Sequence, residues 1–155
     1  MPAVNRILCP IDFSDTSDHA VSYAVMLARQ LGAGLHLVHT WQMPVYTFLD
    51  GAVLLDAETV ARVTDDLQKN LDAAVARHTE PELAVHGHLV QGIPDREIAR
   101  LAGELDCQMI VMGTHGRTGV THMLLGSVAE RVVRTSPVPV LVVPPPSKDA
   151  ASKKK

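Results

Sequence analysis

The sequence predicts an α/β fold in which helices cover both faces of a single open, doubly wound sheet of five parallel strands. Two observations carry this prediction. Short β-branched, apolar runs alternate along the chain with longer segments of helical periodicity. Most of these runs are apolar at nearly every position, as expected for strands that are buried on both faces. The five runs occupy residues 6–11, 35–40, 83–90, 108–112 and 138–143.

Four segments of helical periodicity lie between or beside these runs. The first segment repeats apolar residues at i, i+3 and i+4 from Ala20 and ends at Gly32. The second spans residues 56–78, the third spans 95–105, and the fourth begins near Ser127. Crossovers between parallel strands are right-handed, and ligands of doubly wound sheets bind at the carboxyl ends of the strands. We therefore expect a site in the loops after the first, second and fourth strands.

Composition limits the function before any motif is considered. The 155 residues are 46% apolar and carry a net charge of −3; without the lysine-rich end at 147–155 the net charge is −6. This balance argues against a nucleic-acid partner. The chain has neither a run of about 18 apolar residues nor a signal-peptide pattern, so we expect a cytoplasmic protein without a membrane partner. We expect one domain over 1–144 and a disordered tail over 145–155.

The most informative segment follows the fourth predicted strand and is rich in glycine. It reads Met-Gly-Thr-His-Gly-Arg-Thr-Gly from Met112, and Gly126 and Ser127 then open the last predicted helix. Glycine lets the backbone approach a ligand closely, and a helix start offers unpaired N–H groups with a positive dipole end. The segment therefore predicts phosphate binding, with the Arg117 side chain as one further donor. The alternative is that Ser127 and Glu130 form a capping box without any ligand.

The end of the first strand carries the second motif, Pro10-Ile-Asp-Phe-Ser14. Asp12 can accept hydrogen bonds from a ribose or a base, or approach a metal ion bound to phosphates. The alternative is a turn carboxylate, with Ser14 or Asp15 capping the following helix. Neither the G-x-G-x-x-G nor the G-x-x-x-x-G-K-[ST] nucleotide fingerprint is present, which disfavours a P-loop ATPase.

These two motifs together resemble the ATP-binding branch of the universal stress protein family. The resemblance covers residues 6–143 and rests on two motifs. The first is Pro-x-Asp-x-Ser at the end of the first strand. The second is G-x-x-G at 113–116, followed after nine residues by the G-S pair at 126–127. It implies a Rossmann-like fold, similar to that of the adenine nucleotide alpha hydrolases, that holds ATP with Mg²⁺ or Mn²⁺ bound through the phosphates. The phosphate contacts it implies are Gly113, Gly116, Gly126, Ser127 and Val128. The adenine and ribose contacts it implies are Pro10, Ile11, Asp12, Thr40 and Met112.

We expect a stress-response sensor or switch that binds ATP with little or no hydrolysis. The glycine-rich segment lacks a lysine to neutralise a transferring phosphate, although Arg117 could take part of that role, and no catalytic residue is evident. Two alternatives stay open. One is a nucleotide-free protein-interaction module of the same fold, and the other is a slow ATP hydrolase.

Three further features bear on partners. Trp41, Tyr46 and Phe48 cluster after the second predicted strand, either as a lid or partner surface or as a loop packed on its own sheet. His86-x-His88 places two imidazoles on one face of a regular strand, where solvated histidines are commoner than metal ligands. The last run is expected to be an edge strand. The family resemblance implies a homodimer formed through this strand, from Val138 to Val143.

Overall fold

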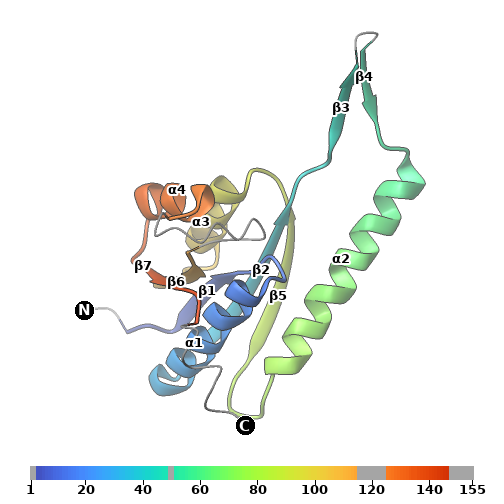
Figure 1. Cartoon of the computed structure of the whole chain (residues 1–155). Coiled ribbons are helices and arrows are strands. Elements are labelled where there is room, and N and C mark those ends of the chain that lie inside the picture. Colours follow the sequence, from blue (N-terminus) through green and yellow to red (C-terminus); the bar gives the residue numbers. More distant parts are fainter. Residues whose placement is uncertain (1–2, 49–50, 115–124, 147–155) are drawn as a thin grey trace.

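The computed structural model describes residues 3–48, 51–114 and 125–146 and contains the predicted sheet (Figure 1). Five parallel strands lie in the order β5-β2-β1-β6-β7. Their bounds are β1 Arg6–Pro10, β2 Gly34–Trp41, β5 Val85–Gln91, β6 Met109–Gly113 and β7 Val140–Val143. The chain winds outward from β1 to β2 and β5, then crosses back to β6 and β7 on the other side of β1. The winding direction therefore reverses between β1 and β6.

Helices cover both faces of the sheet, so the predicted fold class is confirmed. The bounds are α1 Asp15–Leu31, α2 Ala57–His78, α3 Pro94–Glu104 and α4 Ser127–Thr135. Helices α1 and α2 pack on one face around a core that includes Ile7, Leu35 and Leu37. Helices α3 and α4 pack on the other face, around a core that includes Leu8 and Ile110 (Figure 1).

The predicted helix boundaries follow from local capping chemistry. Helix α1 starts where the Ser14 hydroxyl accepts a hydrogen bond from the Ser17 amide, and it ends at Gly32, whose φ of 65° favours glycine. Helix α2 starts where the Asp56 carboxylate accepts a hydrogen bond of 2.8 Å from the Thr59 amide. Side-chain caps thus fix the starts of α1 and α2 from residues nearby in the sequence.

A β-hairpin that the sequence analysis missed lies between β2 and α2. It consists of β3 Val45–Phe48 and β4 Gly51–Leu54, which pair antiparallel with each other in a separate two-stranded sheet. In Figure 1 the hairpin extends away from the main sheet beyond the end of β2. The sequence carries Asp-Gly, a common hairpin signal, at positions 50 and 51, but in the structure Gly51 is already the first residue of β4 and pairs with Phe48.

The aromatic cluster is divided by this hairpin. Trp41 is the last residue of β2 rather than part of the following loop. Tyr46 and Phe48 belong to β3, but their side chains lie outside the described part of the structure. The prediction of a lid or partner surface at these two residues is therefore not tested.

Smaller differences concern the ends of the elements. Strand β5 begins at Val85 rather than at 83, and β7 begins at Val140 rather than at 138. Strand β7 lies at an edge of the sheet, as predicted. Of the expected tail, residues 147–155 lie outside the described residues. Among the helices that the structure describes, none is long and apolar enough to cross a membrane.

The contact between α2 and β5 gives a prediction about Gly87. A Cβ atom built on Gly87 would lie 2.8 Å from Val75 Cγ2 and 3.0 Å from Leu71 Cγ, in the middle of this interface. We expect Gly87→Ala to lower the free energy of unfolding by roughly 1–3 kcal/mol, because the helix must shift to admit the methyl group. The measurement is urea denaturation of the variant and the native chain.

Gly103→Ala is the matched control. Gly103 lies in α3, and a Cβ atom there would meet nothing within 4 Å. Because alanine has the higher helix propensity, this variant should be as stable as the native chain or up to about 1 kcal/mol more stable. Equal losses in both variants would contradict the described packing of α2 on β5.

Candidate functional site

A cavity of about 370 Å³ opens at the carboxyl ends of β1 and β6. This is where the strand order reverses, the usual position of a ligand in a doubly wound sheet. Its volume is within the range of small-molecule sites. The lining residues come from three strand ends and three helix starts: Pro10, Ile11, Asp12, Ser17, Thr40, Pro94, Ile98, Met112, Gly113, Thr114, Gly126, Ser127, Val128 and Ala129.

The cavity collects nine of the eleven predicted site residues from four separate parts of the chain. They are Pro10, Ile11, Asp12, Thr40, Met112, Gly113, Gly126, Ser127 and Val128. The other two, Gly116 and Arg117, lie outside the described residues. The structure therefore brings together the described residues of the predicted site, whose roles remain to be tested.

Five lining residues are not among the eleven predicted for the site. They are Ser17, Pro94, Ile98, Thr114 and Ala129. Pro94 carried a usable signal, because proline favours the first turn of a helix and the helix that it opens follows a parallel strand. Ile98 belongs to the core cluster as well as to the cavity wall.

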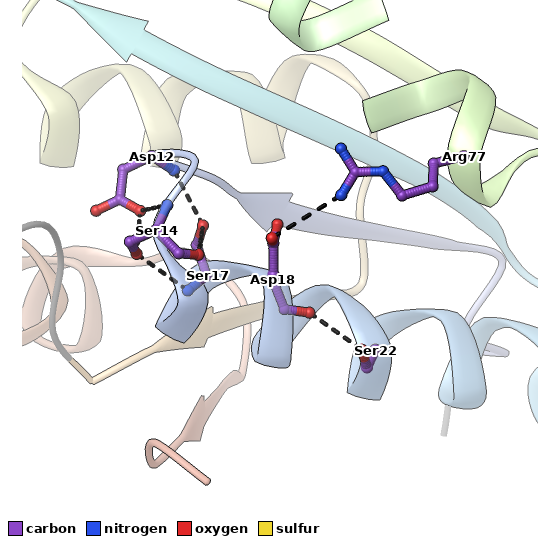
Figure 2. Close-up of polar contacts among 6 residues, drawn as sticks. All are labelled: Asp12, Ser14, Ser17, Asp18, Ser22 and Arg77. Carbon is purple, nitrogen blue, oxygen red and sulfur yellow. Dashed lines mark hydrogen bonds and ion pairs between the residues drawn. The ribbon is translucent and has the colours of Figure 1, made fainter. Parts of the chain in front are cut away.

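The loop after β1 holds Asp12 in place through a short chain of hydrogen bonds (Figure 2). Asp12 Oδ1 accepts hydrogen bonds from the Ser14 amide at 3.0 Å and from the Ser14 hydroxyl at 2.5 Å. The Ser17 hydroxyl donates to the Ser14 carbonyl at 3.0 Å. Phe13, between Asp12 and Ser14, has a φ of 62°, a backbone conformation that is unusual for a bulky residue and often marks functional loops.

Both interpretations of Asp12 thus apply at once. Its Oδ1 atom fixes the turn, and Ser14 rather than Asp15 caps α1. The carboxylate nevertheless lines the cavity, and it is the only acidic group in the described lining. It can therefore accept hydrogen bonds from hydroxyl groups of a ligand without giving up the turn.

The start of α4 contradicts the alternative of a capping box formed by Ser127 and Glu130. The N-cap residue is Gly126, so Ser127 is the first helical residue, and the described structure shows no side-chain hydrogen bond to this N-cap. A glycine has no side chain to cap the helix, and Ser127 lies one position too late to do so. Within the part of the chain that the structure describes, no side chain caps the first turn of α4, whose amides lie at the cavity wall.

The two described ends of the glycine-rich segment, Thr114 and Gly126, are hydrogen-bonded to each other. The Gly126 amide donates a hydrogen bond of 2.7 Å to the Thr114 carbonyl, and the Thr114 amide donates to the Val143 carbonyl at 3.1 Å. These bonds join the end of β6, the start of α4 and the end of β7. They fix the two ends of the segment at the cavity.

Helix α3 presents a second N-terminus to the cavity. Its N-cap is Ile93, also without a side-chain hydrogen bond in the described structure, and Pro94 follows at the first helical position. Arg131 of α4 lies 3.7 Å from the Asp95 carboxylate of α3, which ties the two helix starts together. Two positive dipole ends therefore converge on one cavity.

The cysteines do not contribute a nucleophile. Burial raises the pKa of the Cys9 thiol to about 12 and that of Cys107 to about 11. Both side chains are buried, and both remain neutral thiols at pH 7. The cavity therefore offers binding groups, namely apolar walls, helix amides and one carboxylate.

A second cavity of about 350 Å³ meets the first at Asp12 and Thr40. Its walls come from the end of β2, the residues beside the hairpin and the first half of α2. Among its apolar side chains, Trp41 comes from β2, and Val60 and Leu67 come from α2. The buried residues of α2, Leu71 and Ala74, both lie in its second half. The first half of α2 thus faces this opening rather than the core.

Comparisons with known proteins agree with this architecture. The model of the universal stress protein family matches residues 3–144. A universal stress protein of Methanocaldococcus jannaschii is 32% identical over 93% of this chain and 84% of its own length. Among solved structures, a universal stress protein family member from Burkholderia pseudomallei is 29% identical, with a TM-score of 0.72 over 93% of this chain and 98% of that one. Another, a universal stress protein in complex with cAMP, is 25% identical, with a TM-score of 0.64 over 94% of this chain and 100% of that one.

Proposed function

Since the chain belongs to the universal stress protein family, we propose that it binds ATP with Mg²⁺ or Mn²⁺ in the cavity between β1 and β6. It then acts as a stress-response sensor or switch with little or no hydrolysis. One observation carries the proposal: the N-terminus of α4, which no described side chain caps, lines the same cavity as Asp12 and Gly113.

The chemistry of the lining supports a nucleotide rather than a simple anion. Pro10, Ile11 and Met112 supply apolar surface for a purine, Asp12 can accept hydrogen bonds from the ribose hydroxyls, and the two helix starts attract phosphates. The related structure in complex with cAMP supports an adenine nucleotide as the ligand class. Each part of an adenine nucleotide thus has a suitable partner in one cavity.

The proposed arrangement assigns a part of the ligand to each group. Phosphates bind at Gly113, Ser127 and Val128, with Gly116, Arg117 and Gly126 completing their environment. The base and ribose lie against Pro10, Ile11, Asp12, Thr40 and Met112. A divalent metal ion is carried by the phosphates and offsets their charge near Asp12.

Equilibrium binding of three probes tests this function. We expect saturable binding of ATP with Mg²⁺, weaker binding of adenosine, and no binding of ribose 5-phosphate at the same concentrations, because the purine contributes most of the apolar contact. No binding of ATP by the folded chain would favour the nucleotide-free interaction module. A turnover of about 1 per second or faster would favour the hydrolase.

Asp12→Asn should weaken ATP binding by about fivefold. The amide oxygen of asparagine can still accept the two hydrogen bonds from Ser14, so the turn is kept. It is a weaker acceptor for ribose hydroxyls than a carboxylate, since hydrogen bonds to charged groups are worth about 1 kcal/mol more. Calorimetric titration with ATP measures the change. Asp15→Asn, in the first turn of α1 outside the cavity lining, is the control and should leave the affinity unchanged.

We also propose a homodimer formed through the last strand. Strand β7 pairs with β6 on one side only, so among the described residues its outer edge has no strand partner. Leu141 on this strand is 38% exposed. Sedimentation at micromolar concentration should give the mass of a dimer, and a monomer would contradict the proposal.

A further inference from the structure

Three histidines meet on the face of the sheet that α3 and α4 cover. His36 comes from β2, and His86 and His88 come from the neighbouring edge strand β5. The parallel register pairs His36 with His86 and Val38 with His88. The sequence alone places only His86 and His88 on one face; the position of His36 beside them depends on the strand register, which cannot be read from the sequence.

Two of these rings point nitrogen atoms at each other. His36 Nδ1 lies 2.9 Å from His88 Nε2, and the ring of His86 stacks on His36 with centroids 5.1 Å apart. Two nitrogen ligands at about 2.0–2.1 Å from one ion are about 2.9 Å apart when the angle at the ion is 90°. That angle is typical of square-planar or tetragonal Cu²⁺ and Ni²⁺ sites. Tetrahedral Zn²⁺ needs a separation of about 3.3 Å.

The surroundings of the pair suit neutral imidazoles. Burial and the neighbouring histidines lower the pKa of His36 to about 4 and also lower the pKa of His88, so both rings are neutral imidazoles at pH 7. Neutral imidazole is the form that binds metal ions. The positive charge of Arg6 on β1 also acts on His36 and makes the histidine pair less attractive to a cation. The Arg6 guanidinium donates a hydrogen bond to the Leu105 carbonyl.

The site lies apart from the nucleotide cavity. His36 precedes the cavity residue Thr40 by four positions on β2, which is about 13 Å along a strand. A metal ion at the histidines would therefore be distinct from one carried by nucleotide phosphates. The described residues include no group of three or more His, Cys, Asp or Glu arranged to hold a metal ion. A site here is thus limited to two protein ligands plus water.

We propose that His36 Nδ1 and His88 Nε2 form a two-imidazole chelate for a divalent transition metal ion of the Cu²⁺ type. The two nitrogens already have the separation that adjacent ligands of such an ion require. His88 is only partly buried and His86 beside it is exposed, so the ion has access from solvent and water can complete its coordination. Binding requires loss of the hydrogen bond between the rings: the proton between them moves to the other nitrogen of the ring that carries it, so that both rings stay neutral and both facing nitrogens offer a lone pair to the ion.

The test is titration of the untagged full chain with Cu²⁺ in the absence of nucleotide. Glycine is added as a competitor, because the chain has eight histidines that can each bind copper weakly. We expect one strong site per chain, with an electron paramagnetic resonance spectrum that shows two nitrogen ligands from imidazole. His36→Gln and His88→Gln should each weaken this site by at least about tenfold and leave one imidazole ligand in the spectrum.

His78→Gln is the matched control. His78 ends α2 and has no part in the cluster, so this variant should bind Cu²⁺ as the native chain does. Circular dichroism of all three variants checks that they fold. Absence of a strong site in the native chain, or equal affinity in the native chain and His36→Gln, would overturn the proposal and leave the contact as a hydrogen bond only.

Discussion

Ser127→Glu should weaken ATP binding by about 100-fold or more while leaving the fold intact. Ser127 is the first residue of α4 and lines the cavity at the proposed phosphate position. A carboxylate there would occupy the positive end of the helix dipole and repel the phosphates. Two unit charges 4 Å apart near a protein surface interact by about 4 kcal/mol, and 100-fold corresponds to about 2.7 kcal/mol.

The same substitution should not harm stability. Acidic residues in the first turn of a helix are favourable by about 0.3–1 kcal/mol, and Ser127 is exposed in the described structure. Its melting temperature should equal or slightly exceed that of the native chain. A loss of ATP binding can then be assigned to charge at the site and not to unfolding.

Ser127→Gln separates charge from size. Glutamine has the shape of glutamate without its charge, so we expect less than a tenfold loss of ATP affinity. Adenosine, which has no phosphate, should bind both variants about equally well. Fluorescence or calorimetric titration gives these affinities. If Ser127→Glu bound ATP as tightly as the native chain, the phosphates could not lie at the start of α4.

The sheet and the position of the site could be predicted because they depend on local patterns. Central strands such as β1 are apolar at consecutive positions because both faces are covered, and this pattern is visible without any tertiary contact. Once the strands are parallel, their carboxyl ends must share one edge. Asp12, Thr40 and Gly113 are far apart in sequence, but that rule alone brings them to one cavity.

Two of the features that escaped prediction depend on a contact between distant segments or on the backbone at a helix start. Ser127 fits the capping-box pattern, and only the backbone shows that the cap is Gly126 instead. The contact between His36 and His88 requires the register of β2 on β5, which no local pattern encodes. The hairpin at 45–54 forms a sheet of its own, so the alternation of strands and helices that indicates the main sheet does not include it, and the glycine of its Asp-Gly pair lies in β4.

Leu35→Ala should produce the largest loss of stability. Leu35 is fully buried in β2, and its strand neighbours in register are Ile7 of β1 and Val85 of β5, which are also buried. Truncating a buried leucine costs about 2–5 kcal/mol, a large part of the 5–15 kcal/mol that stabilises a typical domain. We expect the melting temperature to fall by roughly 5–15 °C. Leu31→Ala, at a position that is 47% exposed, should change it by only a few degrees.

ATP should restore much of this loss if the proposed site is correct. Leu35 lies near the amino end of β2, whereas the cavity lies at the carboxyl end, so the affinity of the folded variant should be unchanged. A ligand that binds only the folded state at 100 times its dissociation constant adds about 2.7 kcal/mol of stability. Thermal denaturation of Leu35→Ala with ATP and Mg²⁺ should therefore recover several degrees, and Leu35→Ala combined with Ser127→Glu should recover no more than about two degrees at the same ATP concentration. Equal recovery in both would place the ligand elsewhere, because only binding at the start of α4 depends on the charge at position 127.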